Sequence, residues 1–107
     1  MKIKKINRGF DIIEFEAWEN DKQVGHILGY TSGNQGYLRK VYVKPEYHNQ
    51  GIGTKLIKKF ENAAKLDSNE IVLKAIDQRI FHKLGYIENK AYTEENNINL
   101  IKKLDNY

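Results

Sequence analysis

The chain has 107 residues, 40% of them hydrophobic and 30% charged, which suffices for one packed core but not for two domains, so we predict a single domain over residues 1–107. Its net charge of +4 suits a polyanionic ligand, but is too weak and too scattered to predict specific nucleic-acid binding. The absence of cysteine excludes disulfides, thiolate metal sites and a cysteine nucleophile, and it favours a cytoplasmic location. No apolar run approaches the roughly 20 residues of a membrane span.

The first half of the chain has the pattern of β-strands. Apolar and polar residues alternate over residues 11–19, which predicts a half-buried strand. Turn-forming residues separate it from two further strands, at residues 23–31 and 37–44, and Pro45 ends the second of these. If residues 2–6 also form a strand, four strands precede the first helix.

The second half alternates between helices and strands. The spacing of apolar residues predicts a helix over residues 51–64. Asp77 as N-cap and Gly85 as C′ residue predict a short helix over 78–84, and strands are expected over 70–76 and over roughly 86–93 and 98–104. The strand at 70–76 is largely apolar, as expected of a strand buried in a parallel pair. The predicted fold class is therefore α+β, with a mixed, mostly antiparallel sheet and one parallel crossover that passes through the first helix.

The clearest chemical signal lies where the third strand leads into that helix. The helix begins at Gly51 and Gly53, and the first N–H groups of a helix have no intrahelical partner and lie at the positive end of its dipole. Glycine allows a phosphate to approach the backbone closely. The segment 41–54 therefore predicts an anion cradle of main-chain donors, with a glycine spacing unlike that of P-loops or dinucleotide-binding motifs.

Two motifs in this chain resemble those of the GNAT superfamily of acyl-CoA N-acyltransferases. In that family a strand ending in V-x-P is followed by R/Q-x-x-G-x-G/A and an amphipathic helix, and a later short helix ends in Y-E-K-L-G-F. The corresponding residues here are Val43-Lys44-Pro45, His48-Asn49-Gln50-Gly51-Ile52-Gly53 and Phe81-His82-Lys83-Leu84-Gly85-Tyr86. The resemblance covers roughly residues 10–105. It implies a GNAT-like fold that lacks the usual first two helices, because only residues 7–10 are available to form them.

The resemblance implies an N-acetyltransferase that moves an acetyl group from acetyl-CoA to a primary amine by direct attack. It places the pyrophosphate of the cofactor on the helix N-terminus and the pantetheine arm beside the preceding strand, where a backbone N–H near Tyr42 or Val43 polarises the thioester carbonyl. The implied cofactor-binding residues are Val41, Tyr42, Val43, His48, Asn49, Gln50, Gly51, Ile52, Gly53, Thr54 and Phe81.

The chain departs from the family pattern at three places in these motifs and the strand before them. His48 replaces the arginine or glutamine that opens the cradle, which implies weaker or pH-sensitive binding unless it is simply a solvated loop residue. Phe81 replaces a tyrosine that often protonates the leaving thiolate. Arg39 and Lys40 occupy the part of the strand from which relatives often contribute a carboxylate base.

The sequence therefore does not assign the general base or the general acid to one residue. Candidate bases are Glu14, Glu16 and His26, or a water chain to solvent, although both glutamates fit a solvated strand face better than a catalytic role. Tyr86 is a candidate acid. The three histidines show no metal-ligand spacing, and no metal is predicted.

The missing helices imply an open acceptor side. Such a site suits a large acceptor, for instance a protein lysine or N-terminus, or a site completed by a second subunit, and a homodimer is predicted because sheet would otherwise stay exposed. Two other functions remain alternatives. The protein is either a coenzyme A-binding module with little catalysis or a partner-binding protein that uses the open sheet face.

Overall fold

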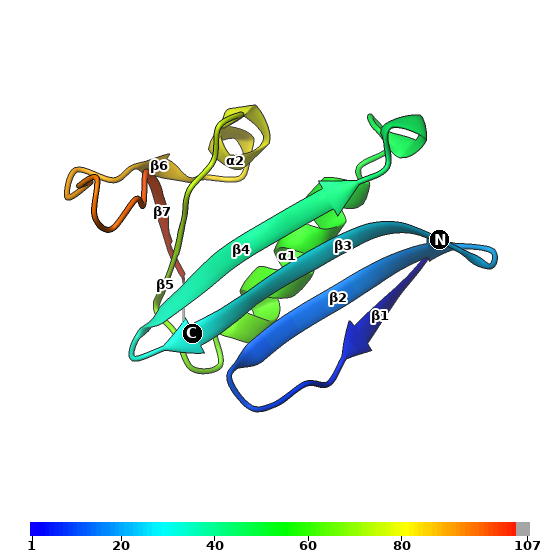
Figure 1. The fold of residues 1–107 in the computed structure, drawn as a ribbon, viewed down its shortest axis with the longest axis horizontal. Coiled ribbons are helices and arrows are strands. Elements are labelled where there is room, and N and C mark those ends of the chain that lie inside the picture. The colour runs from blue at the N-terminus through cyan, green and yellow to red at the C-terminus, as the bar shows by residue number, and fades with distance from the viewer. Residues whose placement is uncertain (105–107) are drawn as a thin grey trace.

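The computed structural model describes residues 1–104. Figure 1 shows a long twisted sheet with one long helix behind it. In chain order the elements are β1 (Lys2–Ile6), β2 (Ile12–Glu19), β3 (Lys22–Ser32), β4 (Gln35–Val43), the 3₁₀ turn η1 (Pro45–Tyr47), α1 (Ile52–Ala64), β5 (Glu70–Leu73), α2 (Arg79–Lys83), β6 (Ile87–Glu88) and β7 (Leu100–Lys103).

The seven strands form one sheet in the order β1-β2-β3-β4-β5-β7-β6. Strands β1 to β4 form an antiparallel meander, β4 and β5 are parallel, and β7 lies between β5 and β6. The α+β class and the parallel crossover through α1 are therefore as the sequence predicts. No helix among the described residues is long and apolar enough to cross a membrane.

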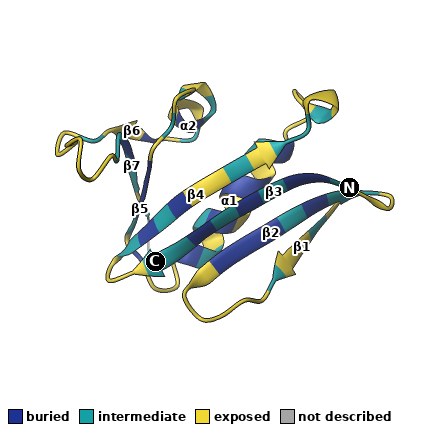
Figure 2. Ribbon diagram, viewed as in Figure 1, coloured by how far each residue is buried: buried dark blue, intermediate teal, exposed yellow. Residues whose placement is uncertain are grey.

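Helix α1 packs against one face of β2, β3 and β4, and its buried side chains form the centre of the core (Figure 2). Close approach requires glycine on β3. A Cβ at Gly29 would lie 2.2 Å from the carbonyl oxygen of Tyr37 and 2.4 Å from the ring of Phe60, so no other residue fits there. The opposite face of these strands carries no helix, because residues 7–11 join β1 to β2 directly (Figure 1).

The strand predicted at residues 86–93 is wrong beyond Glu88. Residues 89–99 instead form turns in which Asn89, Thr93 and Asn96 bond their side chains to nearby backbone groups. Such bonds compete with the strand ladder, which explains why β6 has only two residues. β5 is also shorter than predicted and ends at Leu73, and this early end shapes the functional site.

Candidate active site

β4 and β5 form a fork. They pair only from Gln35 opposite Glu70 to Leu38 opposite Leu73, and beyond this point β4 pairs with β3 only. One cause is a bulge in β4, since Leu28 pairs with Lys40 while the next residue of β3 pairs with Leu38, which leaves Arg39 as an extra residue.

The other cause of the fork is Asn99, just before β7. Its side chain accepts a hydrogen bond from the N–H of Ala75 at 3.0 Å and donates one to the carbonyl of Ala75 at 2.9 Å. The chain after β5 is thereby held toward β7 and away from β4. The gap between β4 and the segment that leads into α2 follows from these two features together.

An open groove of about 860 Å³ fills the fork and extends to the start of α1. One wall is β4 and the turn that follows it, and the other is the segment from Leu73 to α2. Its floor is apolar and includes Ile57 and Phe81. It is therefore a long slot with an apolar floor, closed at the fork and ending at a helix N-terminus.

The start of α1 has the main-chain donors that the sequence predicts. Gly51 precedes the helix in the left-handed region, with φ of 79°, and a Cβ there would meet nothing within 4 Å. The first intrahelical bond is donated by the N–H of Lys55 to the carbonyl of Gly51, at 3.0 Å. The N–H groups of residues 52–54 consequently have no intrahelical partner, and this end of the groove suits an anion.

The free edge of β4 presents alternate residues to the groove. The N–H of Lys44 donates to Val24 on β3. By the alternation of an antiparallel pair, Tyr42 also bonds toward β3, while the backbone groups of Val41 and Val43 point to the groove. The carbonyl of Val43 accepts a hydrogen bond from Nε2 of His48 at 2.8 Å. The backbone donor predicted near Tyr42 or Val43 is therefore available at Val43, and equally at Val41, but not at Tyr42.

Nine of the eleven predicted cofactor-binding residues line this one groove. They are Val41, Val43, His48, Asn49, Gly51, Ile52, Gly53, Thr54 and Phe81. The other two do not line it. Gln50 is exposed in the turn before α1, and the side chain of Tyr42, 49% exposed, lies on the sheet face away from α1, where it pairs with His26.

Tyr86 is not placed to act in the groove. It is 1% exposed, its ring packs edge-on against Phe81 with centroids 5.4 Å apart, and its hydroxyl donates to Glu61 at 2.8 Å. Burial, with the Glu61 carboxylate as a smaller cause, raises the pKa of Tyr86 far above its usual value. Lys102 completes this cluster through bonds of 3.1 and 3.2 Å to Glu61.

The candidate bases lie on β2 and β3, outside the groove. The expectation that Glu14 is solvated is wrong: it is 5% exposed, Nε2 of His26 lies 2.6 Å from its Oε2, and Arg8 bonds its other oxygen. The hydrogen bond with His26 is the main cause that holds the pKa of Glu14 below its usual value, with Arg8 adding to it against the opposing effect of burial. Glu16 is half-buried and accepts a hydrogen bond from the indole of Trp18 at 3.1 Å.

Sequence reasoning missed the second wall of the groove. Lys74, Ala75, Ile76 and Ile80 line it, and so does Asp77, which Arg79 binds through Nε at 3.0 Å and Nη2 at 2.7 Å. These hydrogen bonds from Arg79 lower the pKa of Asp77 to about 2. The sequence signal for this wall is the motif Phe81–Tyr86, but that motif does not show how Asn99 holds the segment before α2.

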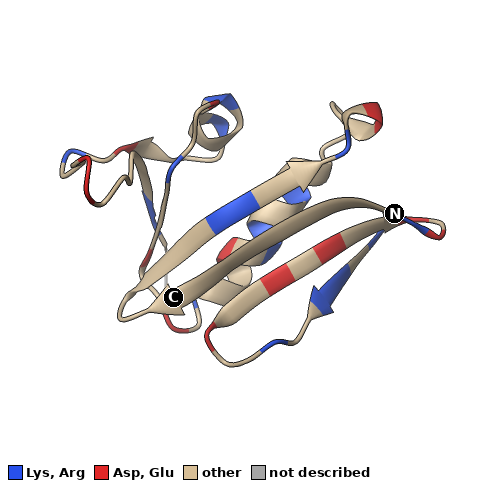
Figure 3. Cartoon of the chain, in the orientation of Figure 1, with Lys and Arg blue, Asp and Glu red and all other residues tan. Residues whose placement is uncertain are grey.

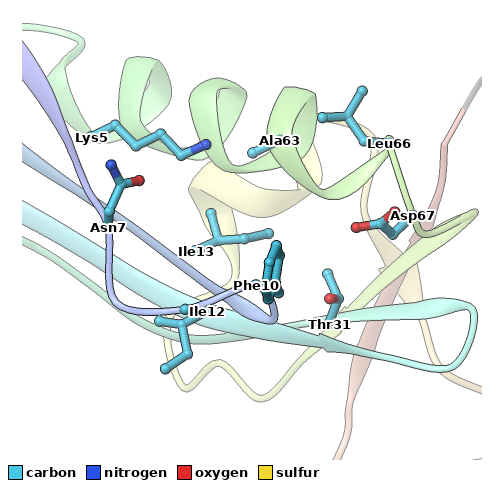
Figure 4. Close-up of a pocket in the computed structure, with 10 residues that line it drawn as sticks. Lys5, Asn7, Phe10, Ile12, Ile13, Thr31, Ala63, Leu66 and Asp67 are labelled. Carbon is cyan, nitrogen blue, oxygen red and sulfur yellow. The ribbon is translucent and has the colours of Figure 1, made fainter.

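A second hollow, of about 390 Å³, lies at the C-terminal end of α1 (Figure 4). Lys5, Phe10, Ala63 and Leu66 are among its lining residues, and Phe10 and Leu66 are largely exposed. None of the predicted site residues lines it. The groove at the other end of α1 is therefore the candidate active site.

Comparison with known proteins assigns the family. The model of the acetyltransferase (GNAT) domain family matches residues 12–88, more than half of the chain. The protein belongs to the GNAT superfamily of acyl-CoA N-acyltransferases, as the two motifs predict. The thialysine N-epsilon-acetyltransferase of Bos taurus is 50% identical over 46 residues, a match that covers 38% of this chain and 27% of the bovine protein.

Solved structures share the fold. The PaiA N-acetyltransferase of Thermoplasma acidophilum, determined in complex with coenzyme A, superposes with a TM-score of 0.77 and 25% identity over 88% of this chain and 62% of that one. A GNAT-family acetyltransferase of Staphylococcus aureus Mu50 superposes with a TM-score of 0.76 and 25% sequence identity. That match covers 88% of this chain and 68% of the Staphylococcus protein. The chain thus spans less than two thirds of the PaiA protein and about a quarter of the bovine relative.

Proposed function

We propose that this protein transfers an acetyl group from acetyl-CoA to a primary amine by direct attack within a ternary complex. The observation that carries this proposal is the groove itself, because one continuous slot joins an anion-binding helix N-terminus to a free strand edge and ends at a fork. This shape suits a ligand with phosphates at one end and a long, uncharged arm at the other.

The donor is expected to bind along the length of the groove. Its pyrophosphate accepts hydrogen bonds from the free N–H groups of residues 52–54, and Gly51 and Gly53 allow it to reach them. The pantetheine arm pairs with the backbone of Val41, which faces the groove, as an added strand would. This arrangement brings the thioester to the fork, where Leu38 and Leu73 close the slot.

In the transfer step the lone pair of the neutral amine attacks the thioester carbon. The carbonyl oxygen becomes an oxyanion, which a groove-facing N–H of Val41 or Val43 stabilises. The carbon–sulfur bond then breaks, and the thiolate departs with its electron pair and takes up a proton. The products are the N-acetyl amide and coenzyme A, and the ammonium loses one proton to solvent overall. No covalent enzyme intermediate is required.

The acceptor approaches from the sheet face that no helix covers. This open side admits either a large acceptor, such as a protein lysine or N-terminus, or a small amine. The name of the bovine relative places its acceptor nitrogen at the ε-position of thialysine, which supports a primary amine as the acceptor class here.

The test combines binding with turnover. Calorimetry should show stoichiometric binding of acetyl-CoA to the purified chain, and a thiol-release assay with a panel of amines should show release that depends on the amine. Absence of acetyl-CoA binding to the folded protein would overturn the proposal.

Phe81 favours a second candidate function. It lines the groove but offers no proton to a leaving thiolate, and Arg39 and Lys40 stand where a carboxylate base would be expected. A coenzyme A-binding module with little catalysis shares these features. Binding of acetyl-CoA with no thiol release above the uncatalysed rate, for any amine in the panel, would select this candidate.

We also propose that two copies of the chain associate. The uncovered face of the sheet leaves Ile12 38% exposed and Tyr42 49% exposed, and a second copy is the simplest cover for such a face. Light scattering at high micromolar concentration should give twice the chain mass of 12.5 kDa. A value equal to the single chain would overturn this part of the proposal.

A further inference from the structure

Three cationic side chains meet at the fork. Arg39 is the extra residue of the β4 bulge, Lys40 follows it, and Lys74 is the first residue after β5, so it stands opposite the bulge. All three are exposed and all line the groove. Among residues 1–104 none of them forms an ion pair, whereas other cations such as Arg8 and Lys102 do. Figure 3 shows the basic segment of β4 near the point where the strand leaves β5.

The phosphates of the donor do not account for these cations. The anion cradle is formed by the start of α1. It lies beyond Val43, the end of β4 that is farther from the fork. Three residues of strand, from Lys40 to Val43, already span about 10 Å, and the turn that follows adds further distance. The uncharged part of the donor fills this interval. The fork is thus next to the thioester, where the acceptor has to bind.

The charge at this end of the groove is not balanced by acidic side chains. Within residues 1–104, Asp77 is the only acidic residue that lines the groove, and its carboxylate accepts hydrogen bonds from Arg79 at 3.0 and 2.7 Å. Glu14 and Glu16 lie on other strands and have partners of their own. A second positive charge on an acceptor would therefore be repelled, while a negative charge would find three unpaired cations within the same pocket.

We propose that Arg39, Lys40 and Lys74 form the acceptor subsite and select a primary amine that also carries a carboxylate, and that they disfavour polyamines. This inference rests on the proposed acetyl transfer and adds the substrate class. The cations bind the carboxylate and orient the amine toward the thioester, so they are positioning residues rather than catalytic ones. Their flexible side chains suit a carboxylate several bonds from the amine.

Three amines with the same carbon chain provide the test. They are 4-aminobutyrate, 4-aminobutanamide and butane-1,4-diamine, whose second groups are anionic, neutral and cationic. Each exposed ion pair is worth a factor of about 1.5–5, so we expect kcat/KM for the anionic amine to exceed that for the diamine by roughly tenfold at low salt. The difference should shrink as ionic strength rises, because salt screens exposed charges.

A charge-matched pair of triple variants isolates the subsite. Arg39→Gln/Lys40→Gln/Lys74→Gln should bring the ratio between the anionic amine and the diamine close to one. Lys58→Gln/Lys59→Gln/Lys65→Gln removes the same charge from exposed positions on and next to α1, outside the groove, and should preserve the ratio. Acetyl-CoA affinity, measured by calorimetry, should change little in the first variant, because the cradle is intact.

Binding provides a readout that does not depend on turnover. The same three amines are titrated into the complex of the protein with coenzyme A, and 4-aminobutyrate should bind most tightly. A diamine that binds or reacts as well as the amino acid in the wild type, or a preference unchanged in the fork variant, would overturn the substrate class. In either case, retained acetyl-CoA binding with acetylation of any amine leaves the proposed function standing, whereas loss of acetyl-CoA binding in the wild type refutes the function itself.

Discussion

Asn99 holds Ala75 by two hydrogen bonds, one accepted from its N–H at 3.0 Å and one donated to its carbonyl at 2.9 Å. The two residues are 24 positions apart, and neither belongs to a regular strand. Their contact keeps the segment after β5 beside β7, with which β5 pairs along its whole length, whereas the pairing of β5 with β4 ends at Leu73. We therefore expect the width of the groove at the fork to depend in part on one amide side chain that lies outside the groove.

Replacement of Asn99 by alanine should consequently affect both stability and donor binding. Two partly buried backbone groups would lose their partners, which we expect to cost about 1–3 kcal/mol of unfolding free energy. The segment would also be free to move toward β4, so acetyl-CoA affinity should fall about tenfold. Urea denaturation and calorimetry measure the two effects.

Asn89→Ala is the matched control for this variant. Asn89 also bonds backbone groups on both sides, at Ile98 and Ala91, but it does so in the loop 89–99 outside the groove. It should lose a similar amount of stability while its acetyl-CoA affinity stays within twofold. An equal loss of affinity in both variants would show that the fork does not depend on Asn99 in particular.

Gly53→Val tests the cradle. A Cβ at residue 53 would lie 3.3 Å from Cδ1 of Ile80 and 3.8 Å from Cγ2 of Val43, so even one added carbon requires a small shift of the Ile80 side chain. We expect the branches of valine to crowd the groove beside the free N–H groups. We expect calorimetry to show no measurable acetyl-CoA binding, with the circular dichroism of the folded protein retained. Asn62→Val puts the same β-branched residue at an exposed position of α1 and should bind normally. Unchanged affinity in a folded Gly53→Val protein would refute the cradle.

The features that the sequence could predict are local ones. The apolar spacing over residues 51–64 and the glycines at its start are enough to predict α1 and the cradle, because helix periodicity and helix-end chemistry depend on neighbours in the chain. The alternation over residues 11–19 correctly separates the two faces of β2. It could not show that Glu14 is buried, because Arg8 comes from a loop and His26 from the next strand.

The fork could not be predicted, because its causes are not local. The bulge at Arg39 exists only in the register between β3 and β4, and the second wall depends on Asn99, far along the chain. The strand predicted over residues 86–93 ends at Glu88. Its asparagine and threonine side chains instead form local turns, a competition that periodicity does not measure.

Tyr86→Phe tests whether this tyrosine is only structural. The variant removes the hydrogen bond to Glu61 but leaves Lys102 to pair with that carboxylate, so the expected loss of unfolding free energy is about 1 kcal/mol. Because the hydroxyl is buried away from the groove, kcat should stay within twofold. Tyr92→Phe, at a 49% exposed position, is the control and should change neither quantity. A fall in kcat of tenfold or more in stable Tyr86→Phe protein would identify Tyr86 as the acid.

The pKa of Glu14 predicts how stability depends on pH. The hydrogen bond with His26 and the contact with Arg8 lower this pKa from its usual 4.5, so the folded protein holds the carboxylate in its charged form more strongly than the unfolded chain does. The resulting stabilisation is fully present above about pH 4.5 and is lost as the pH falls through the folded-state pKa.

Comparison with Glu14→Gln measures this contribution. At pH 7 the wild type should be more stable than Glu14→Gln by about 1–2 kcal/mol, and the difference should disappear on acidification below pH 4.5. Urea denaturation of both proteins at pH 7, 5, 4 and 3 measures this difference in unfolding free energy. Glu16→Gln, on the same strand, removes a half-buried carboxylate bonded only by Trp18 and should show a smaller difference at pH 7. A difference for Glu14→Gln that persists unchanged at pH 3 would contradict the assignment.

Phe81→Tyr tests whether the leaving thiolate benefits from an acid. Phe81 is 5% exposed and lines the groove in which we propose that the donor binds. Positioned general acids contribute roughly 10²–10⁴-fold to rates, and Tyr86 is bonded to Glu61 and cannot serve. We expect kcat to rise at least several-fold and to gain a basic limb in its pH profile, while acetyl-CoA affinity stays within a few-fold. Phe81→Leu is the control, because it removes the ring without adding a hydroxyl, and it should not raise kcat.

If kcat and its pH dependence are unchanged in well-folded Phe81→Tyr protein, either the thiolate leaves unassisted or the ring does not face the sulfur. A crystal structure of the variant with coenzyme A distinguishes these two explanations by the distance from the new hydroxyl to the thiol.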